Sequence, residues 1–532
     1  MKLLRRFLIL SHRYLGIVLS ALIVMWFATG ITMMYVGGMP RLTPELRLER
    51  MPGLDLSRVH LTPAEAAERG LVDPSAGRVA VLSVMDRPAY RFGEREAVTV
   101  FADNGEVLEE VTLDQARTIA SRFMNLPEDR IHLLGTITEV DQWTLLQGRQ
   151  LPLHKFSVDD DAATELYVSP QTGEVSVLTT RRSRGFAWIS TIPHWLYFTA
   201  LRTNQAAWYN TVVYGAALAC VLAVLGLVLG VTQWRRQKPL AASIPYSGWM
   251  RWHYITGVVF GVFTLTWAFS GMLSMEPFAW TNARGLEVER DVFTGGALDL
   301  SRFSAMDQAT WNRVLGGRAI KEMDLARIQD EHYYVVRAGA ATPTAEGDRE
   351  RLHQPYNVTG RAESDRLLVS ASTLEIRRQP FSADSLVTRL RTALPDAPIA
   401  EQQLLTEYDS YYYSKARQTP LPVLRVKFND PAQTWVYIDP GMSQVLAQIH
   451  RLNRVERWLY NGLHSLDFAF WYNSPAWDVV MILLCLGGLA SSGIGLMLGM
   501  RRLRRGAVRT AGWMGSASDG DDRRLISRPS GS

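Results

Sequence analysis

Four of the ten histidines in this 532-residue sequence have the spacing expected of metal ligands, because they recur as two pairs. His12 and His253 are 241 positions apart, and His194 and His464 are 270 positions apart, each at the end of a long apolar stretch. A neutral imidazole is a common metal ligand, and two imidazoles that meet across an axis suit six-coordinate haem iron. The spacing therefore predicts two metal-binding histidine pairs at different depths.

Other interpretations of these histidines stay open. Each could be an interfacial side chain without a metal, held beside a tryptophan such as Trp195, Trp252 or Trp458. Repetition at the same offset as nearby glycines favours ligation. A crossed pairing, for example His12 with His464, is a further alternative. The remaining histidines have no ligand spacing and are predicted to be surface or core residues: His60, His132, His154, His332, His353 and His450.

Four stretches without a charged residue must position these histidines. They are Tyr14–Pro40, Thr203–Trp234, Trp252–Met275 and Val479–Met500. Each is long enough to cross about 30 Å of hydrocarbon as a helix, which excludes a soluble cytoplasmic enzyme despite a mean hydropathy of −0.04. Both cysteines lie inside these stretches, so neither a disulfide framework nor a zinc motif is expected.

Basic residues gather in three short segments beside these stretches, and the segments contain no acidic residue. They are Lys2, Arg5 and Arg6, then Arg235, Arg236, Lys238 and Arg251, and finally Arg501, Arg502, Arg504, Arg505 and Arg509. Such segments stay in the cytoplasm, so both termini and the short middle loop are predicted to be cytoplasmic. The long loops, 41–202 and 276–478, are then outside. This placement explains the net charge of +5 without nucleic-acid binding.

The second half of the chain repeats the first. Adding 241 relates Gly16 to Gly257, Trp26 to Trp267 and Gly30 to Gly271, and adding 270 relates Tyr167 to Tyr437, Arg184 to Arg454 and Trp188 to Trp458. After a shift of one residue, Trp208 corresponds to Trp477 and Gly230 to Gly499. Both halves enter the membrane in the same sense, which predicts a parallel repeat about an axis along the membrane normal. The glycines are expected to admit a flat macrocycle or a neighbouring helix.

The long loops are predicted to be α+β. In the first, a helix over Leu61–Gly70 precedes strands at Arg78–Val84, Ala89–Phe92 and Ala97–Phe101, and a helix from Thr112 to Phe123 precedes strands at Ile137–Thr144, His154–Val158, Glu165–Ser169 and Glu174–Leu178. The second loop repeats this order from Ser301 and from Ser382. Tyr411–Tyr413 is interpreted as a covered strand, with a chelate-binding surface as the alternative. Asp159–Asp161 is interpreted as a solvated turn rather than a cation site.

The order of these motifs resembles the PepSY-associated transmembrane family. The resemblance rests on the H-x-x-x-G starts at His12 and His253, the Thr29-Gly30 and Ser270-Gly271 exits, and the histidines that precede the second and fourth spans. It covers nearly the whole chain except the tail, and the helix-plus-strand units are similar to PepSY domains. Members similar to this chain include inner-membrane ferric-siderophore reductases with b-type haem. Other PepSY proteins are thought to modulate peptidases.

The expected architecture is an α-helical membrane protein with four transmembrane helices in two parallel internal repeats and two extracytoplasmic α+β, PepSY-like domains. The expected divisions are 1–40, the N-terminal tail and first transmembrane helix; 41–185, the first periplasmic domain; 186–234, an interfacial segment and second helix; 235–251, a cytoplasmic loop; 252–275, the third helix; 276–455, the second periplasmic domain; 456–500, an interfacial segment and fourth helix; and 501–532, a disordered cytoplasmic tail.

The resemblance implies two b-type haems with bis-histidine ligation, one near each membrane face. Arg13 and Arg251 are candidates to bind the propionates, although they also satisfy the charge rule without a haem. Trp26 and Trp267 are candidates for a relay between the haems or for an interfacial belt.

The expected function is electron transfer across a bacterial inner membrane to a periplasmic acceptor, with a ferric siderophore as the expected substrate of an oxidoreductase. The sequence has no dinucleotide-binding, P-loop or hydrolase motif, so the electron donor is expected to be a quinol or a cytoplasmic reductase. A homodimer stays open. The alternative function is a non-catalytic membrane sensor or regulator whose outer domains bind a peptide or a peptidase.

Overall fold

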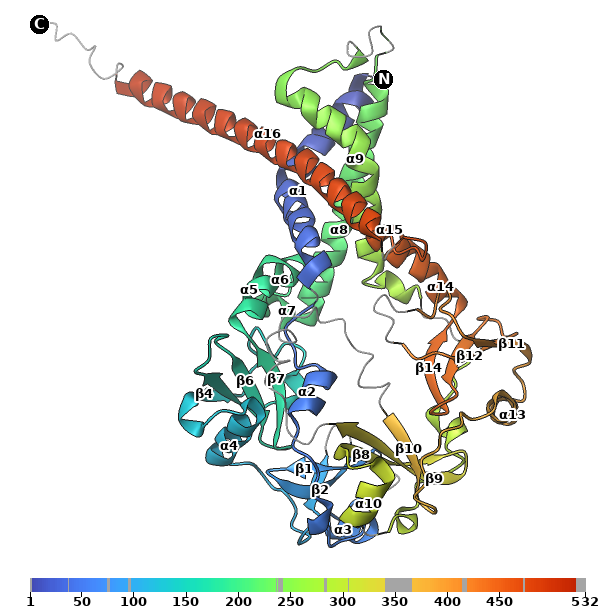
Figure 1. Cartoon of the computed structure of the whole chain (residues 1–532). Helices are drawn as coiled ribbons and strands as arrows, with labels where there is room; N and C mark the ends of the chain where they lie inside the picture. The colour runs from blue at the N-terminus through green and yellow to red at the C-terminus, as the bar shows by residue number, and fades with distance from the viewer. Residues whose placement is uncertain are drawn as a thin grey trace, which may run out of the picture.

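The chain folds into a bundle of long helices and a larger β-sheet body at one end of it, as the computed structural model in Figure 1 shows. The structure describes residues 2–36, 38–73, 77–93, 97–235, 237, 243–281, 285–304, 306–339, 366–413, 419–471 and 474–522. Arg236, Lys238 and His353 lie outside the described residues, so no structural statement is made about them.

Among the described residues, four helices are long and apolar enough to cross a membrane. They are α1 (Lys2–Val36), α8 (Gln205–Thr232), α9 (Gly248–Leu273) and the part Pro475–Arg505 of α16 (Pro475–Asp522). The four predicted spans are thereby confirmed. A helix suits lipid because it satisfies its own backbone N–H and C=O groups. α1 and α9 each pack against both α8 and α16, so α1 and α9 lie opposite each other in the bundle.

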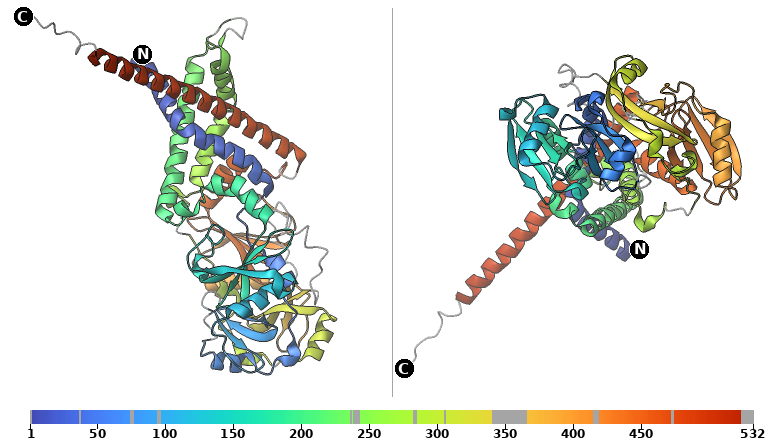
Figure 2. Two further views of the ribbon diagram at one scale, coloured as in Figure 1. Left: turned by 90° about the vertical axis from the view of Figure 1, so that its left-hand side faces the viewer. Right: turned by 90° about the horizontal axis from the view of Figure 1, so that it is seen from below.

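The helix α16 extends well beyond the bundle, as Figure 2 shows. We predicted a disordered tail from residue 501, but the structure continues this helix to Asp522. Each residue added to an existing helix gains a hydrogen bond without a new nucleation cost, and no proline interrupts the sequence from 476 to 522. Residues 523–532 lie outside the described part of the chain.

The outer body contains three antiparallel sheets, ordered β10-β9-β8-β1-β2-β3, β4-β5-β6-β7 and β11-β12-β13-β14. Their strands are β1 (Val79–Val84), β2 (Arg87–Phe92), β3 (Val98–Phe101), β4 (Ile131–Ile137), β5 (Leu153–Val158), β6 (Glu165–Ser169), β7 (Glu174–Thr179), β8 (Ala319–Ile328), β9 (Glu331–Gly339), β10 (Arg366–Ser370), β11 (Ile399–Leu405), β12 (Val423–Phe428), β13 (Trp435–Asp439) and β14 (Gln444–Ile449). The predicted α+β class is confirmed.

Short helices pack on these sheets or link them to the bundle. α3 (Pro63–Arg69) and α10 (Gln308–Leu315) accompany the six-stranded sheet, whereas α4 (Leu113–Met124) and α13 (Ala383–Ala393) cover one four-stranded sheet each. The linking helices are α2 (Pro44–Arg50), α5 (Arg181–Ile189), α6 (Thr191–Trp195), α7 (Thr199–Arg202), α14 (Arg451–Arg457) and α15 (Leu463–Ser465). The helix predicted from Thr112 is found as α4, and Thr112 and Gln115 form a capping box at its start, because each side chain binds the backbone N–H of the other residue.

Most predicted strands are found within a few residues of their expected positions, but two segments differ. The apolar run Ile131–Ile137 forms β4, whereas most of the predicted strand Ile137–Thr144 is a loop that turns at Asp141. Tyr411–Tyr413 is also a loop, because backbone N–H groups of Tyr411 and Tyr412 bind the carboxylate of Asp409 instead of a neighbouring strand.

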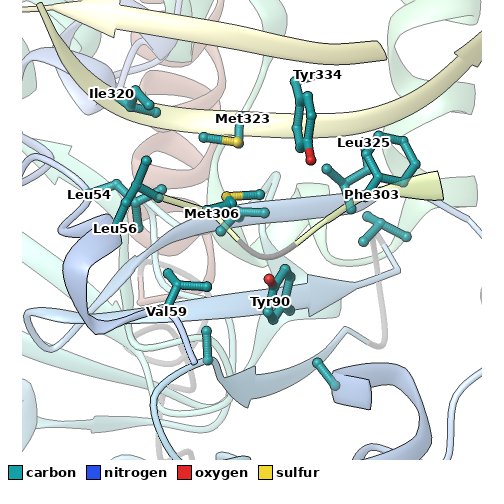
Figure 3. Close-up of a cluster of buried hydrophobic side chains, with 14 of the residues drawn as sticks. Leu54, Leu56, Val59, Tyr90, Phe303, Met306, Ile320, Met323, Leu325 and Tyr334 are labelled. Atoms are coloured by element: carbon teal, nitrogen blue, oxygen red, sulfur yellow. The ribbon is translucent and has the colours of Figure 1, made fainter. Parts of the chain in front are cut away.

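The six-stranded sheet joins the two long loops, because β1 to β3 come from the first and β8 to β10 from the second. β1 pairs directly with β8, and Val81 lies opposite Met323. Figure 3 shows the core beside this sheet, where Tyr90, Met323 and Tyr334 contribute buried side chains from both loops. Neither loop can complete this core alone, so the two outer regions fold as partners.

A buried carboxylate ties the same junction together. Glu322 on β8 is 2 % exposed at its side chain, and it pairs with Arg47 at 2.7 Å and with Arg78. Arg47 also pairs with Glu174 on β7 at 2.6 Å, so one guanidinium bridges two sheets. Burial acts to raise the pKa of Glu322, but the guanidinium groups of Arg47, Arg78 and Arg337 outweigh it and lower this pKa to about 2.

We expect Glu322→Gln to destabilise the outer body by about 2 kcal/mol, because Arg47 and Arg78 each lose one of two carboxylate partners and keep only Glu174 and Asp324. Since the folded-state pKa lies below the ordinary value of 4.5, this stabilisation is present above about pH 4.5 and is lost as the pH falls toward 2. Calorimetry of detergent-solubilised protein should therefore show a lower melting temperature for the variant at pH 7 and similar values near pH 2.

The matched control is Glu106→Gln, because Glu106 is 60 % exposed and pairs with Arg87 at 3.2 Å. A Glu322→Gln variant that melts like this control at pH 7 would contradict the bridging role of Glu322.

Candidate functional site: two histidine pairs in the bundle

The structure brings the four repeated histidines together as His12 with His253 and His194 with His464. His12 lies on α1 and His253 on α9, the two opposite helices of the bundle. His194 lies on α6 and His464 on α15, short helices that precede α8 and α16. The crossed pairing of His12 with His464 is not the arrangement found.

The first pair, His12 and His253, has ring centres 6.2 Å apart with the ring planes inclined by 38°. Nδ1 of His12 lies 3.2 Å from the carbonyl oxygen of Leu222 on α8, and Nδ1 of His253 lies 3.1 Å from that of Ser491 on α16. Each imidazole is thus fixed by a helix that lies between the two histidine-bearing helices.

Glycines make room for this first pair. A Cβ atom at Gly226 would lie 2.9 Å from Cε1 of His12, and one at Gly495 would lie 3.2 Å from Cε1 of His253. Sequence reasoning missed both glycines, although their spacing of 269 positions is that of Gly230 and Gly499. The signal was therefore available, but only the fold shows that these positions face imidazole rings.

The second pair, His194 and His464, has ring centres 6.4 Å apart and nearly perpendicular rings at 81°. The hydroxyl of Thr29 lies 3.0 Å from Nδ1 of His194, and that of Ser270 lies 3.0 Å from Nδ1 of His464. A Cβ at Gly30 or Gly271 would lie 3.6 Å from Cε1 of the facing ring, which is an ordinary van der Waals contact. Thr29 and Ser270 are therefore the residues of these two motifs that hold the histidines, and the glycines border the rings.

In all four histidines the hydrogen bond engages Nδ1, and within the described part of the chain Nε2 has no hydrogen-bond partner. A metal-ligating histidine typically uses one ring nitrogen for the metal and the other for an orienting hydrogen bond. Removal from water lowers the pKa of His194 and of His464 to about 4, so both imidazoles are neutral near pH 7 and keep a lone pair for a metal.

The ring separations fit an iron between two axial imidazoles. A metal–nitrogen bond of about 2 Å and a ring radius of about 1.15 Å put two ring centres about 6.3 Å apart across one metal. The two pairs measure 6.2 and 6.4 Å. A site of three or more His, Cys, Asp or Glu side chains is absent from the described residues, so a macrocycle rather than the protein would have to supply the other ligands.

The two pairs lie at opposite ends of the bundle. Thr29, which contacts His194, is 17 residues beyond His12 on α1, or about 25 Å along the helix axis. Phe27 and Trp267 lie in the apolar layer between the pairs, with ring centres 5.5 Å apart. An aromatic contact within an apolar cluster therefore lies between the two histidine pairs.

Trp26 makes a contact that was not predicted, and its role as a relay or as part of an interfacial belt stays a prediction. Its indole N–H donates to the backbone oxygen of His194 at 3.1 Å, so it holds the histidine-bearing segment against α1. Trp267 makes no corresponding bond among the described residues, and its buried N–H is unpaired. Arg13 and Arg251 lie beside His12 and His253, and neither side chain has a hydrogen bond or ion pair with another described residue.

Other predicted candidates lie away from the pairs. Asp160 caps its own turn, because its carboxylate accepts from the backbone N–H and the hydroxyl of Thr164. His60, His132, His154, His332 and His450 all lie in the outer body. Tyr411 and Tyr413 contact the segment that carries His464 rather than forming an open surface.

The sequence model of a family described as PepSY-associated TM region matches residues 9–502 of this chain. No curated protein matches the chain significantly. The matched range contains all four histidines, both outer loops and nearly all of the membrane-spanning helices.

We expect Gly226→Val or Gly495→Val to displace the facing imidazole, because the first added atom already lies within 3.2 Å of the ring. Displacement breaks the Nδ1 hydrogen bond and should weaken metal binding at the His12–His253 pair by about tenfold or more. The measurement is the rate at which haem that has been added to the purified protein transfers to apomyoglobin. Gly493→Val on the same helix α16 is the control, since open space surrounds that position. Equal transfer rates for all three variants would contradict the steric role of Gly226 and Gly495.

Proposed function

This chain belongs to the PepSY-associated transmembrane family, and from that premise we propose that it is an electron-transfer protein with two bis-histidine b-type haems. The proposal names His12 and His253 as the ligands of one haem and His194 and His464 as those of the other. A haem at each pair would accept and donate one electron at a time. The single observation that carries the proposal is the distance between the two ring centres of each pair, which matches that of two imidazoles bound axially to one iron.

The protein's own groups have defined tasks in this proposal. Leu222 and Ser491 orient the first pair through backbone oxygens, and Thr29 and Ser270 orient the second pair through hydroxyl groups. These bonds present Nε2 of each ring to the centre of the pair. Arg13 and Arg251 supply positive charge for propionates beside the first pair.

The same proposal includes a parallel internal duplication of the chain. The duplication is supported by matching contacts in the two halves. The backbone oxygens that contact Nδ1 of His12 and of His253 belong to Leu222 and Ser491, which are 269 positions apart, as are Gly226 and Gly495. Val81 and Met323, which face each other across the β1–β8 pairing, are 242 positions apart, close to the offset of 241 between His12 and His253. A two-fold axis through the bundle and the shared sheet accounts for both spacings.

The proposed acceptor is ferric iron in a siderophore at the periplasmic side, which makes the protein a ferric-siderophore reductase. Reduction would release the metal, because Fe(II) binds the oxygen ligands of such chelators weakly. The proposed donor is a quinol or a cytoplasmic reductase that delivers electrons near His12 and His253. The protein positions the haems, and the haems carry the redox chemistry.

The proposed location is a bacterial inner membrane, with both termini and the loop 235–251 in the cytoplasm and the three sheets in the periplasm. Reporter fusions at residue 243 and after residue 510 should report cytoplasm, and fusions near residues 120 and 350 should report the periplasm. The reason is the concentration of basic residues in three short segments without acidic residues. A cytoplasmic signal from either long loop would contradict the parallel arrangement.

Single histidine substitutions test the haem assignment. His12→Ala and His253→Ala should remove the same haem, so the double variant should lose no more haem than either single variant. His194→Ala and His464→Ala should behave likewise for the other haem, because a single axial imidazole leaves the iron five-coordinate. The measurement is pyridine-haemochrome content per chain together with the low-spin EPR signals.

His60→Ala in the outer body is the control and should leave the haem content unchanged. Full haem retention and unchanged spectra in all four ligand variants would refute the assignment. A colourless wild-type protein from haem-replete cells would refute the electron-transfer function and favour a sensor or regulator.

A further inference from the structure

Each outer region has one loop that is fastened to a sheet by an aspartate, and this loop contacts the segment that carries the outer histidine. In the first region the loop lies between β4 and β5 and turns at Asp141. In the second it lies between β11 and β12 and turns at Asp409. We call these the Asp141 loop, residues 138–147, and the Asp409 loop, residues 406–413.

The two aspartates make the same kinds of bonds. Asp141 accepts from the Tyr167 hydroxyl at 2.7 Å and from Lys155 Nζ at 3.3 Å, and Asp409 accepts from the Tyr437 hydroxyl at 2.9 Å and from Arg425 at 2.8 Å. The second carboxylate oxygen of each accepts backbone N–H groups of its own loop: Trp143 and Thr144 for Asp141, and Tyr411 and Tyr412 for Asp409.

The anchoring side chains come from the rigid part of each sheet. Tyr167 on β6 and Tyr437 on β13 are fully buried, and they are 270 positions apart, as are Lys155 and Arg425. Burial and the adjacent carboxylate raise the pKa of both tyrosines, so each hydroxyl keeps its proton and donates it to the aspartate. Each loop is therefore held to its sheet by a charge-assisted bond and by the loop's own backbone.

Each loop then contacts the histidine segment on both sides of the histidine. In the first region, Trp143 packs against Trp188, six residues before His194, and Gln142 Nε2 donates to the backbone oxygen of Tyr197, three residues after it, at 2.6 Å. In the second, Trp458, six residues before His464, donates to the Tyr411 hydroxyl at 3.1 Å.

The contact after His464 is made by Tyr413, whose hydroxyl donates to the carboxylate of Asp467, three residues beyond the histidine, at 2.7 Å. Asn461, three residues before His464, also donates to the Tyr413 hydroxyl, at 3.3 Å. The two halves use different side chains, yet each loop contacts the segment six residues before and three residues after its histidine.

The other pair is held differently. Nδ1 of His12 and of His253 contacts a carbonyl oxygen within the bundle, and among the described residues no sheet-anchored loop is bonded to the helix turns that carry them. Each outer histidine contacts a bundle hydroxyl and belongs to a segment that a sheet-anchored loop contacts at two other positions.

From this arrangement we propose that Asp141 and Asp409 are positioning residues for the outer histidine pair, so that the outer sheets set the geometry of His194 and His464. The inference rests on the proposed haem ligation. Groups that orient a ligand are typically worth tenfold or more in metal binding, and small displacements of a ligand change the electronic properties of its metal.

The test compares Asp141→Ala and Asp409→Ala with Asp160→Ala and Asp430→Ala in the full-length, haem-loaded protein. Asp160 and Asp430 are a matched pair because they lie 270 positions apart in turns of the same two sheets and accept from Thr164 and Thr434. These turns bond the starts of α5 and α14, but they make none of the contacts six residues before or three residues after the histidines. The readouts are the two low-spin EPR signals and the rate of haem transfer to apomyoglobin.

We expect Asp141→Ala and Asp409→Ala to change one of the two EPR signals and to release one of the two haems about tenfold faster. The signal assigned to the His12–His253 pair should stay unchanged, and so should both signals in the control variants. Asp141→Asn and Asp409→Asn keep an acceptor for the loop backbone, and they should give smaller shifts of the same signal even where an alanine variant fails to fold.

Unchanged EPR signals and transfer rates in all four Asp141 and Asp409 variants would overturn the positioning role while leaving the haem ligation intact. Equal effects of the control pair would also overturn it, because the cause would then be general weakening of the sheets. A wild-type protein without haem would refute both the proposed function and this inference. A haem-loaded protein whose Asp141 and Asp409 variants are unchanged would refute this inference alone.

Discussion

The structure depends on how each of four half-buried imidazoles satisfies its two ring nitrogens. Each of the four histidines bonds a neighbouring helix or hydroxyl through Nδ1, and this bond selects the direction in which Nε2 points. An imidazole without that bond would carry an unpaired polar group on both sides in an apolar bundle, at a cost of several kcal/mol. The surrounding glycines, carbonyl groups and hydroxyls are arranged around this requirement.

The requirement is met differently at the two ends of the bundle. At one end, helix carbonyls and the small residues Gly226 and Gly495 are sufficient, so the site lies entirely within the four long helices. At the other end, the histidines lie on short helices outside the spans, which cannot hold a fixed orientation by themselves. Trp26 and the Asp141 and Asp409 loops supply the missing constraints, and they tie this end to the sheets.

The outer body itself is a joint product of both halves. β1 and β8 pair across the junction, and the buried Glu322 of the second loop pairs with Arg47 and Arg78 of the first. Each loop supplies hydrophobic surface that the other loop covers. Because the six-stranded sheet contains strands of both loops, strands of one loop resist a movement of the other.

The sequence alone determined the four spans, the four candidate histidines, the helix-plus-strand order and the family, because these follow from local composition and from repeated spacings along the chain. It predicted helix starts such as Thr112 well, since a capping box is a contact between residues three apart. It misplaced β4 and the Tyr411–Tyr413 segment, because a long-range bond at Asp141 or Asp409 decides where those loops turn. Only the tertiary structure decided that His12 meets His253, that Gly226 and Gly495 face their rings, and that one sheet combines both loops. These features join residues more than 200 positions apart, and their energies arise from packing and hydrogen bonds that no local pattern in the sequence records.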